Sequence, residues 1–208
     1  DLTPEYTVYA SYTDIFNPQD ERDASKKYLE PVVGSNYEIG LKGSLLNERL
    51  NLSTAYFWST QDNVAELDNA APPDPVTREQ FYKSGGKGNK VQGFEVEVSG
   101  EIMPDWNLTA GYTYTHSLNG DKQRNNTDQP MNMLKMSTAY RLPGAWRGLT
   151  VGGAVNWQSD FYDFAERPIG GRDQDGYLLT DSTKITQQAY TVVNLMSRYQ
   201  FDEHVSAS

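Results

Sequence analysis

The sequence predicts an all-β chain whose antiparallel strands cross a membrane as a segment of a β-barrel. Three observations lead to this prediction. Apolar and polar residues alternate along most of the chain, the alternating stretches are about ten residues long, and the connections between them switch regularly between short and long. Period-two alternation gathers the apolar side chains on one face of an extended strand. One apolar face and a length of about ten residues are what a transmembrane β-strand requires.

The clearest alternation lies in residues 34–45. One face carries Tyr37, Ile39 and Leu41, and the opposite face carries the charged residues Glu38 and Lys42. Full charges in the middle of a polar strand face are typical of a face that contacts water. The stretch is therefore interpreted as a strand with one face toward lipid and the other toward an aqueous interior.

Eight stretches show this alternation and are predicted as strands. Their ranges are 6–15, 34–45, 50–61, 91–102, 106–117, 131–142, 149–160 and 188–201. In chain order, their apolar faces carry Val8 and Tyr12, Ile39 and Leu41, Leu52 and Trp58, Phe94 and Val96, Leu108 and Tyr112, Leu134 and Tyr140, Val151 and Val155, and Val193 and Leu195. A ninth strand is expected to begin near His204.

The connections sort by length. The short ones are 46–49, 103–105, 143–148 and 202–203, and the long ones are 16–33, 62–90, 118–130 and 161–187. Outer-membrane barrels have short periplasmic turns and longer outer loops, whereas a soluble Greek-key sandwich has no reason to sort its connections. The first, third, fifth and seventh strands are therefore expected to run outward.

Aromatic residues make up 12% of the chain, including 14 Tyr and 4 Trp. On the apolar faces they fall at strand ends: Trp58 and Trp157 at outer ends, and Tyr140, Tyr199 and Phe201 at inner ends. This placement is typical of the aromatic girdles of barrels. The alternative is that these rings pack a soluble core, but no amphipathic helix is predicted that could cover one face of the sheet.

Composition excludes several classes of function. The 208 residues include no Cys, which excludes disulfides, Cys-based zinc sites and thiol nucleophiles. A net charge of −10 argues against a nucleic-acid partner. The mean hydropathy is −0.70, and no apolar run approaches the roughly 18 residues of a membrane helix. The chain does not open on a signal peptide, so any targeting segment is expected outside it.

The polar faces indicate a wide barrel. Charged residues predicted to point inward are Glu38, Lys42, Glu95, Glu97, Glu101, Lys135, Arg141 and Arg198. The interior of an eight-stranded barrel is filled by side chains, so this many charges fit a wider, hydrated or plugged lumen better. An open sheet of eight strands would also leave two bare edges in lipid. The sequence therefore predicts a segment of a larger barrel.

Several stretches, taken in order, resemble TonB-dependent siderophore receptors. They are YASYTDIFNPQ at 9–19, LEPVVGSNYEIGLKG at 29–43, the stretch 52–65, GFEVEVSG at 93–100, WNLTAGYTY at 106–114, YRLPG at 140–144, WQS at 157–159 and YTVVNLMSRY at 190–199. The resemblance covers essentially the whole chain and is strongest toward receptors for ferric hydroxamates and ferric pyoverdine-type siderophores. One departure is QPMN at 129–132, where many relatives carry Pro-x-His.

The resemblance implies a 22-stranded barrel in the bacterial outer membrane, of which residues 1–208 would form a partial barrel domain of about eight strands, from the thirteenth to the twentieth. The plug, the TonB-contacting segment, the earlier strands and the closing strand are expected to be absent. The implied function is TonB-dependent uptake of ferric siderophores, without enzymatic activity, cofactor or protein metal ligand, because the siderophore carries the iron. Implied partners are a ferric siderophore, the TonB complex through the missing plug segment, and outer-membrane lipid and lipopolysaccharide.

Candidate siderophore-binding residues come from strand walls and long loops. On the walls, inward-facing polar residues near outer strand ends are Ser11, Thr13, Ser59, Gln61, Thr115 and Gln158, and the aromatic residues Tyr9 and Phe57 share the polar faces. In the loops, the candidates are Tyr82, Tyr162, Phe164, Arg167, Arg172 and Tyr177. Arg side chains would form charge-assisted hydrogen bonds with carboxylate or hydroxamate oxygens. The alternatives are plug packing for the wall residues, and solvation or lipopolysaccharide contact for the loop residues.

Three other functions remain open at this stage: a general porin or small outer-membrane channel, a soluble lipocalin-like or lectin-like binding protein, and a membrane hydrolase. The hydrolase would rely on His116, which has Ser117 beside it and Asp121 nearby. Neighbouring residues on a strand point to opposite faces, so His116 and Ser117 do not form part of a catalytic triad by proximity alone.

Overall fold

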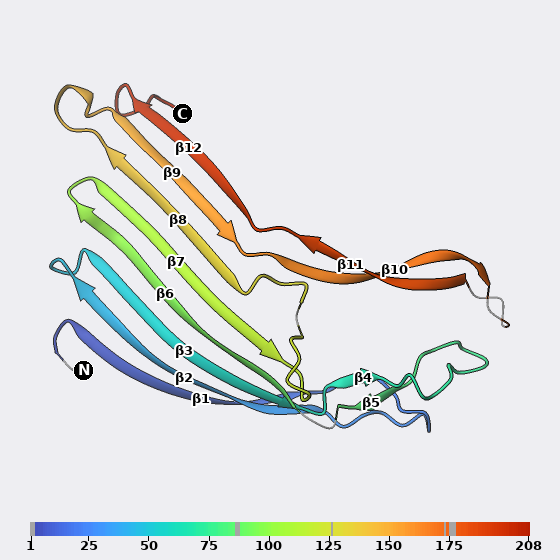
Figure 1. Cartoon of the computed structure of the whole chain (residues 1–208). Helices are drawn as coiled ribbons and strands as arrows, with labels where there is room; N and C mark the ends of the chain where they lie inside the picture. Colours follow the sequence, from blue (N-terminus) through green and yellow to red (C-terminus); the bar gives the residue numbers. More distant parts are fainter. Residues whose placement is uncertain (1–2, 86–87, 126, 173, 175–177) are drawn as a thin grey trace. The chain divides into compact units, whose positions relative to one another are not determined.

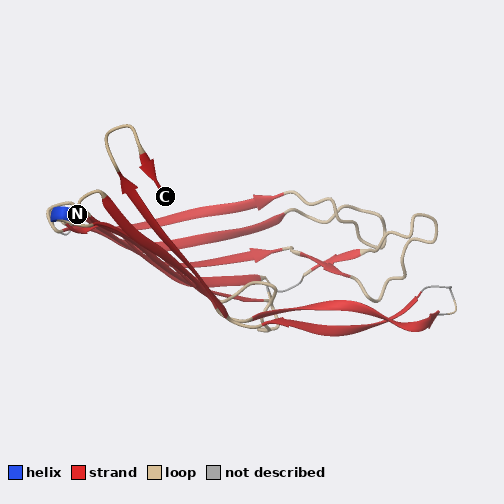
Figure 2. Ribbon diagram, turned by 90° about the horizontal axis from the view of Figure 1, so that it is seen from above, coloured by secondary structure: helices blue, strands red, loops and turns tan. Residues whose placement is uncertain are grey.

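The computed structural model describes residues 3–85, 88–125, 127–172, 174 and 178–208. Its strands are β1 (Tyr6–Asn17), β2 (Val32–Leu45), β3 (Leu50–Asp62), β4 (Ala65–Leu67), β5 (Tyr82–Ser84), β6 (Asn89–Met103), β7 (Trp106–Leu118), β8 (Asn132–Arg141), β9 (Leu149–Gln158), β10 (Phe161–Arg172), β11 (Leu178–Gln187), β12 (Tyr190–Gln200) and β13 (Ser206–Ala207). A single turn of 3₁₀ helix, η1 (Gly144–Trp146), lies in a short connection and is drawn in blue in Figure 2. In the described residues, no helix has the length and apolar character needed to cross a membrane.

Hydrogen bonds order the strands of the main sheet as β1-β2-β3-β6-β7-β8-β9-β12-β13, so strands that follow one another along this sheet also follow one another in the chain. β4 pairs with β5 and β10 with β11 as separate two-stranded antiparallel ribbons (Figure 1). The main sheet is therefore an antiparallel meander, interrupted in the chain by the β4–β5 and β10–β11 ribbons.

The chain divides into two compact units, which are described separately below. Unit 1 comprises residues 1–98 and 115–125, and unit 2 comprises residues 99–114 and 126–208. In unit 1, antiparallel register places Tyr12 opposite Tyr37, and Tyr37 opposite Trp58. The ring centroids of Tyr12 and Tyr37 lie 5.0 Å apart, and those of Tyr37 and Trp58 lie 5.2 Å apart. Three strands thus contribute to one aromatic row at the end of the sheet from which the long loops leave.

The apolar side chains of unit 1 are not covered by the other described residues of that unit. Ile39 is 49% exposed and Tyr56 45%, although both lie in the middle of long strands, and Val8 near the start of β1 is 46% exposed. No hydrophobic side chain among the described residues is fully buried. A soluble protein of this size would bury such residues in a core. The uncovered apolar face is therefore the surface that hydrocarbon would contact, as the alternation predicts.

Unit 2 repeats this arrangement. Val193 and Leu195 of β12 are 61% and 86% exposed. At the short-turn end, the Trp106 and Tyr140 rings lie 5.4 Å apart, and Tyr199 and Phe201 form an edge-to-face pair at 4.9 Å. The prediction that rings collect at strand ends on the apolar face is thus confirmed in each unit.

The predicted strands are confirmed with small shifts at their ends, and the connection predicted as a long loop at 161–187 is wrong. Most of that connection forms β10 and β11, which extend as a two-stranded ribbon (Figure 1). Pro168, Gly170 and Gly171 in this stretch suggest a loop, but the structure accommodates them in an irregularity of the ribbon between Pro168 and Arg172, where both glycines have positive φ. The predicted loop at 62–90 also contains the short ribbon of β4 and β5.

Candidate ligand-binding site

Two loops of unit 1 surround a cleft of about 820 Å³. The 18–31 loop joins β1 to β2, and the 63–88 loop joins β3 to β6. Because β1, β2 and β3 are antiparallel neighbours, both loops leave the same end of these strands. The cleft is lined by Asp20, Glu21, Arg22, Lys26, Tyr28, Asp74, Thr77, Glu79, Gln80, Phe81 and Tyr82.

A tight turn shapes the part of the cleft that the 18–31 loop provides. The Asp23 carboxylate accepts hydrogen bonds from the Ser25 hydroxyl at 2.6 Å and from the backbone N–H groups of Ser25 and Lys27 at 2.8 and 3.0 Å. These bonds hold the pKa of Asp23 below its ordinary value, with the Ser25 hydroxyl as the largest contribution. The turn leaves Lys26 with a φ of 65°, so its side chain is presented from the tip of the loop.

Arg22 and Tyr28 face each other across this turn. The Arg22 Nη2 donates a hydrogen bond to the Tyr28 hydroxyl at 2.5 Å, and its Cζ lies 4.4 Å from the centre of the Tyr28 ring. A guanidinium has five N–H donors, and the Tyr28 hydroxyl uses one of them. Stacking on the ring fixes the plane of the guanidinium while leaving donors for a further acceptor. Arg22 is thus a preorganised donor on the wall of the cleft.

The 63–88 loop contributes Asp74, which is 3% exposed. Its Oδ1 accepts hydrogen bonds from the backbone N–H groups of Val76 and Thr77 at 2.8 and 3.0 Å, and its Oδ2 lies 2.5 Å from the Nζ of Lys26. Lys26 is the largest cause of a strongly lowered pKa at Asp74, followed by the N–H groups of Thr77 and Val76. The carboxylate is therefore ionised at neutral pH, with both oxygens bonded.

A second group of polar residues lies on the strand wall of unit 1. The Tyr9 hydroxyl donates to Glu38 Oε1 at 2.6 Å, and the Nζ of Lys42 lies 5.1 Å from the centre of the Tyr9 ring. The ring lies across Gly40, where an added Cβ would be 2.4 Å from Tyr9 Cε1. Phe57 is opposite Glu38 on the next strand. The absence of a side chain at Gly40 therefore lets an aromatic group lie flat on the polar face.

The ribbon of β10 and β11 carries the candidates of unit 2. The Nζ of Lys184 lies 3.7 Å from the centre of the Tyr162 ring, and Phe164 meets that ring edge-on at 5.7 Å. Arg167 is opposite Asp181 in the register and is exposed, as is Arg172. Phe164, Tyr162 and Lys184 share one face of the ribbon, whereas Arg167, three residues after Phe164, lies on the opposite face.

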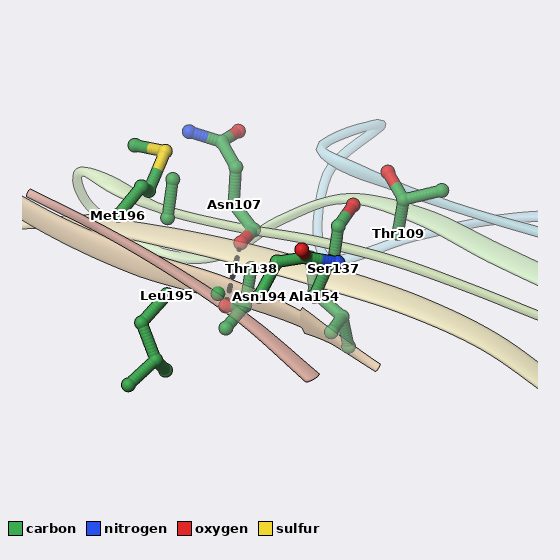
Figure 3. A pocket seen from close by; sticks show the side chains of 11 residues that line it. Asn107, Thr109, Ser137, Thr138, Ala154, Asn194, Leu195 and Met196 are labelled. Carbon is green, nitrogen blue, oxygen red and sulfur yellow. Dashed lines mark hydrogen bonds between the residues drawn. The ribbon is translucent and has the colours of Figure 1, made fainter. Parts of the chain in front are cut away.

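Unit 2 also has a shallow hollow of about 320 Å³ in its sheet, over β7, β8, β9 and β12 (Figure 3). The Thr138 hydroxyl donates to the Asn107 carbonyl at 2.9 Å and accepts from the Trp106 Nε1 at 2.8 Å. Figure 3 shows Asn107 and Met196 on one side of the strands and Leu195 on the other. The hollow lies where small residues such as Ala154 leave space above the backbone of the sheet. Its lining is mainly apolar.

The structure distributes the predicted site residues over three places. Tyr82 lines the loop cleft of unit 1, Tyr9 and Phe57 lie on the wall of the same unit, and Tyr162, Arg167 and Arg172 lie on the ribbon of unit 2. Tyr177 lies outside the described residues. Among the candidates that the structure describes, only Tyr82 lines the cleft.

Sequence reasoning missed most of the cleft. Arg22, Tyr28, Lys26 and Asp74 become neighbours only because two loops meet, and no spacing within either loop indicates this. The one local signal was the pair of turn-forming aspartates, Asp23 before Ala-Ser and Asp74 before Pro-Val-Thr, whose side chains accept N–H groups two or three residues later.

The hydrolase alternative gains no support from the geometry. His116 and Ser117 are consecutive residues of β7, so they point to opposite faces, and Ser117 is 5% exposed. Within the part of the chain that the structure describes, the His116 imidazole has no hydrogen bond to either neighbouring candidate. A triad requires the base and nucleophile to be within hydrogen-bond reach.

Comparisons with known proteins agree with this architecture. Residues 1–208 match the family model "TonB dependent receptor-like, beta-barrel". The chain is 41% identical over 213 residues to the ferripyoverdine receptor of Pseudomonas aeruginosa and 39% identical over 216 residues to the ferric-pyoverdine 358 receptor of Pseudomonas putida. Both alignments cover 100% of this chain, and they span 25% and 24% of those proteins.

Solved structures give the same result. The crystal structure of the ferripyoverdine receptor of the P. aeruginosa outer membrane, bound to ferripyoverdine, matches with a TM-score of 0.84 and 40% identity, over 99% of this chain and 26% of that one. The alcaligin outer-membrane receptor FauA of Bordetella pertussis matches with a TM-score of 0.73 and 38% identity, over 99% of this chain and 32% of that one. The chain thus spans about a quarter of the length of the pyoverdine receptors, and it belongs to the TonB-dependent receptor β-barrel family.

Proposed function

We propose that this chain is part of the barrel wall of an outer-membrane receptor that imports a ferric siderophore of the pyoverdine class. The observation that carries the proposal is the 40% identity, at a TM-score of 0.84 over 99% of the chain, to a receptor whose structure was determined with ferripyoverdine bound. Family membership assigns the chain to the bacterial outer membrane. The uncovered apolar face of its strands is the surface that such a location requires.

In the proposed function, the cleft between the 18–31 and 63–88 loops is a first contact for the ligand. Arg22 would donate charge-assisted hydrogen bonds to an anionic oxygen of the siderophore, while Tyr28 and Tyr82 supply aromatic surface. Tyr9 and Phe57 on the wall, and Tyr162, Arg167 and Arg172 on the ribbon, are proposed as further contacts. Iron would reach the protein as cargo, with the siderophore supplying its ligands.

Energy for transport would come from TonB, acting on a plug segment of the complete receptor. Residues 1–208 would form one part of the barrel around that plug, and the polar wall patch of Tyr9, Glu38 and Lys42 would face it. The aromatic rows at the strand ends would contact lipid, and the outer loops would contact lipopolysaccharide. In this proposal the chain binds and positions its ligand and catalyses no covalent step.

Two alternatives are less well supported. A soluble lipocalin-like or lectin-like protein would need a covered apolar core, yet no hydrophobic residue in the described part of the chain is fully buried. A general porin would share the strand pattern, but the similarity over the whole chain is to siderophore receptors.

Uptake of iron-55-loaded pyoverdines tests the proposal. The full-length gene would be expressed in a strain that lacks its own pyoverdine receptors, with and without a proton-motive-force uncoupler. The proposal predicts saturable uptake of at least one pyoverdine that the uncoupler abolishes. Uptake that is unaffected by the uncoupler and extends to unrelated small solutes would indicate a porin instead.

A further inference from the structure

The most buried charged group in the described residues lies in an irregular outer loop, and not in a strand. Asp74 is 3% exposed, although the 63–88 loop around it consists mainly of exposed residues. Burying a carboxylate costs free energy unless charge and hydrogen bonds compensate for the lost water. Such a group would not persist in a loop whose conformation is free to vary.

The bonds of Asp74 separate into two sets. The N–H groups of Val76 and Thr77 belong to its own loop and shape a local turn, in which Asp74 also accepts Arg78 N–H at its carbonyl at 2.8 Å. The ion pair with Lys26 reaches the other loop. Of the bonds that Asp74 makes, only the ion pair with Lys26 can link the two loops. Substituting Lys26 removes this link and keeps the local turn, so variants at Lys26 and Asp74 distinguish the two roles of the carboxylate.

Other bonds between the loops lie closer to the strands. The Tyr82 N–H donates to the Arg22 carbonyl at 2.8 Å, Gln19 Nε2 donates to the Asn63 carbonyl at 2.8 Å, and Asn63 Nδ2 donates to the Pro31 carbonyl at 3.2 Å. The Lys26–Asp74 pair closes this series at the tip of the 18–31 loop, across the cleft. The two loops are therefore linked both at their bases and at the tip.

We infer that Lys26 and Asp74 form a clasp that couples the 18–31 and 63–88 loops, so that the two loops order and open as one unit. The capped turn around Asp23 presents Lys26, and the turn at 74–79 presents the carboxylate. A cleft whose walls are already ordered spares a ligand the entropy of ordering them. Asp74 is thus a positioning residue for Arg22, Tyr28 and Tyr82. The clasp does not depend on which ligand the receptor takes up.

Hydrogen exchange measured by mass spectrometry on the full-length receptor in detergent micelles, without ligand, tests the clasp. The two variants are Lys26→Met, which leaves the turn at 74–79 intact, and Asp74→Asn, which keeps an oxygen acceptor for Val76 and Thr77. The matched controls are Lys27→Met in the same turn and Asp68→Asn, since Asp68 caps Ala70 N–H within its own loop. Coupling predicts that Lys26→Met speeds exchange at 74–79 and Asp74→Asn speeds exchange at 22–29, each about tenfold or more.

The controls are expected to change exchange in the opposite loop by less than about twofold. Lys26→Arg, which keeps the charge, is expected to retain protection at 74–79. The Lys26→Met/Asp74→Asn double variant is expected to show the same increase in exchange as the single variants, because either substitution alone already removes the ion pair. Unchanged exchange in β1–β3 reports that each variant is folded. If each variant altered only its own loop while the strands stayed protected, the clasp would be ruled out, whether or not the receptor imports pyoverdine.

Discussion

The two units extend beyond their sheet strands in different ways. In unit 1 the extension is a pair of largely irregular loops joined mostly by side-chain bonds and by one backbone bond from Tyr82 to Arg22, with the Lys26–Asp74 pair at their tip. In unit 2 it is the regular ribbon of β10 and β11, held by a backbone ladder from Phe161 and Gln187 to Pro168 and Thr180. The first depends on a few specific side chains, whereas the second depends on repeated backbone bonds that do not require particular side chains.

This difference indicates where sequence change is tolerated. Removing Lys26 leaves the buried Asp74 carboxylate without its ion-pair partner, and removing Asp74 also takes away the acceptor for Val76 and Thr77, so a large effect is expected from either change. Removing one side chain from the β10–β11 ribbon leaves its backbone hydrogen bonds intact, so the expected effect on its stability is small. The fold of the ribbon is therefore expected to tolerate side-chain changes, whereas the shape of the cleft depends on a few side chains of the loop pair.

The largest expected effect is that of Asp74→Ala, which removes both the ion pair and the acceptor for Val76 and Thr77. Limited proteolysis of the full-length receptor is expected to cut the 63–88 loop at least about tenfold faster, with Asp74→Asn intermediate. Cleavage at the wild-type rate in both variants would show that the carboxylate does not order the loop.

Acid should have a related effect on the loop pair. The pKa of Asp74 is lowered in the folded loops, so its stabilising contribution is complete above the unfolded value of about 4 and is lost as pH falls below that value. The charged groups around the cleft are Lys26, Arg22, Asp20, Glu21 and Glu79. Exchange protection at 22–29, corrected for the intrinsic pH dependence of exchange, is expected to be constant from pH 7 to about 5 and to decline below about pH 4.

A constant protection down to the lowest pH at which the barrel stays folded would contradict the role of the Asp74 charge. Asp74→Asn provides the control. Asp23, whose pKa is also lowered, caps backbone N–H groups in the same segment, so the variant is expected to show a smaller acid-dependent loss of protection than the wild type. The ribbon at 161–172 should change less: although Asp163 and Asp181 lie along it, it is held by backbone hydrogen bonds, which do not titrate.

Arg22→Ala tests whether the cleft contacts the ligand. Loss of a charge-assisted hydrogen bond is expected to weaken binding of ferric pyoverdine to the full-length receptor about tenfold, measured by equilibrium binding of the iron-55-loaded siderophore. Arg49→Ala is the matched control, because Arg49 lies in the short turn at the other end of the same strands, where its Nε bonds to the Leu46 carbonyl. Equal affinity of the Arg22 and Arg49 variants would remove the cleft from the binding site.

The smallest expected effect is that of Lys184→Ala on the ribbon. The ammonium lies 3.7 Å from the centre of the Tyr162 ring, and a cation–π contact at an exposed site contributes about 0.5–1 kcal/mol. Hydrogen exchange in β10 and β11 is therefore expected to rise by no more than about fivefold. Collapse of protection along the whole ribbon would show that it depends on single side chains, as the loop pair does.

The sequence predicted the strands well because one simple rule governs them. Where one face meets lipid, Ile39 and Leu41 must alternate with Glu38 and Lys42, and the printed order of residues reveals the alternation directly. The ribbon at 161–187 follows no such rule, because both of its faces are exposed and carry mixed residues such as Phe164 and Lys184. In this stretch the strand pattern is weak, and Pro168 with two glycines favours the prediction of a loop.

The cleft was predictable only in part. Tyr82 was identified as a loop aromatic, but its neighbours Arg22 and Tyr28 come from another loop. The Lys26–Asp74 pair joins residues far apart in the chain, and nothing local distinguishes Lys26 from Lys27 beside it. Contacts of this kind depend on how two loops pack, which period and composition do not encode.

Solvent accessibility of nitroxide labels along β2 tests the two-faced strand most directly. Single-cysteine variants at positions 37 to 42 of the full-length receptor, reconstituted in liposomes, would be labelled and compared for collision with oxygen, which concentrates in lipid, and with a water-soluble nickel complex. Labels at Tyr37, Ile39 and Leu41 should favour oxygen, and those at Glu38 and Lys42 should not. Uniform accessibility, or preference for the nickel complex at Ile39 and Leu41, would contradict a wall between hydrocarbon and an aqueous interior.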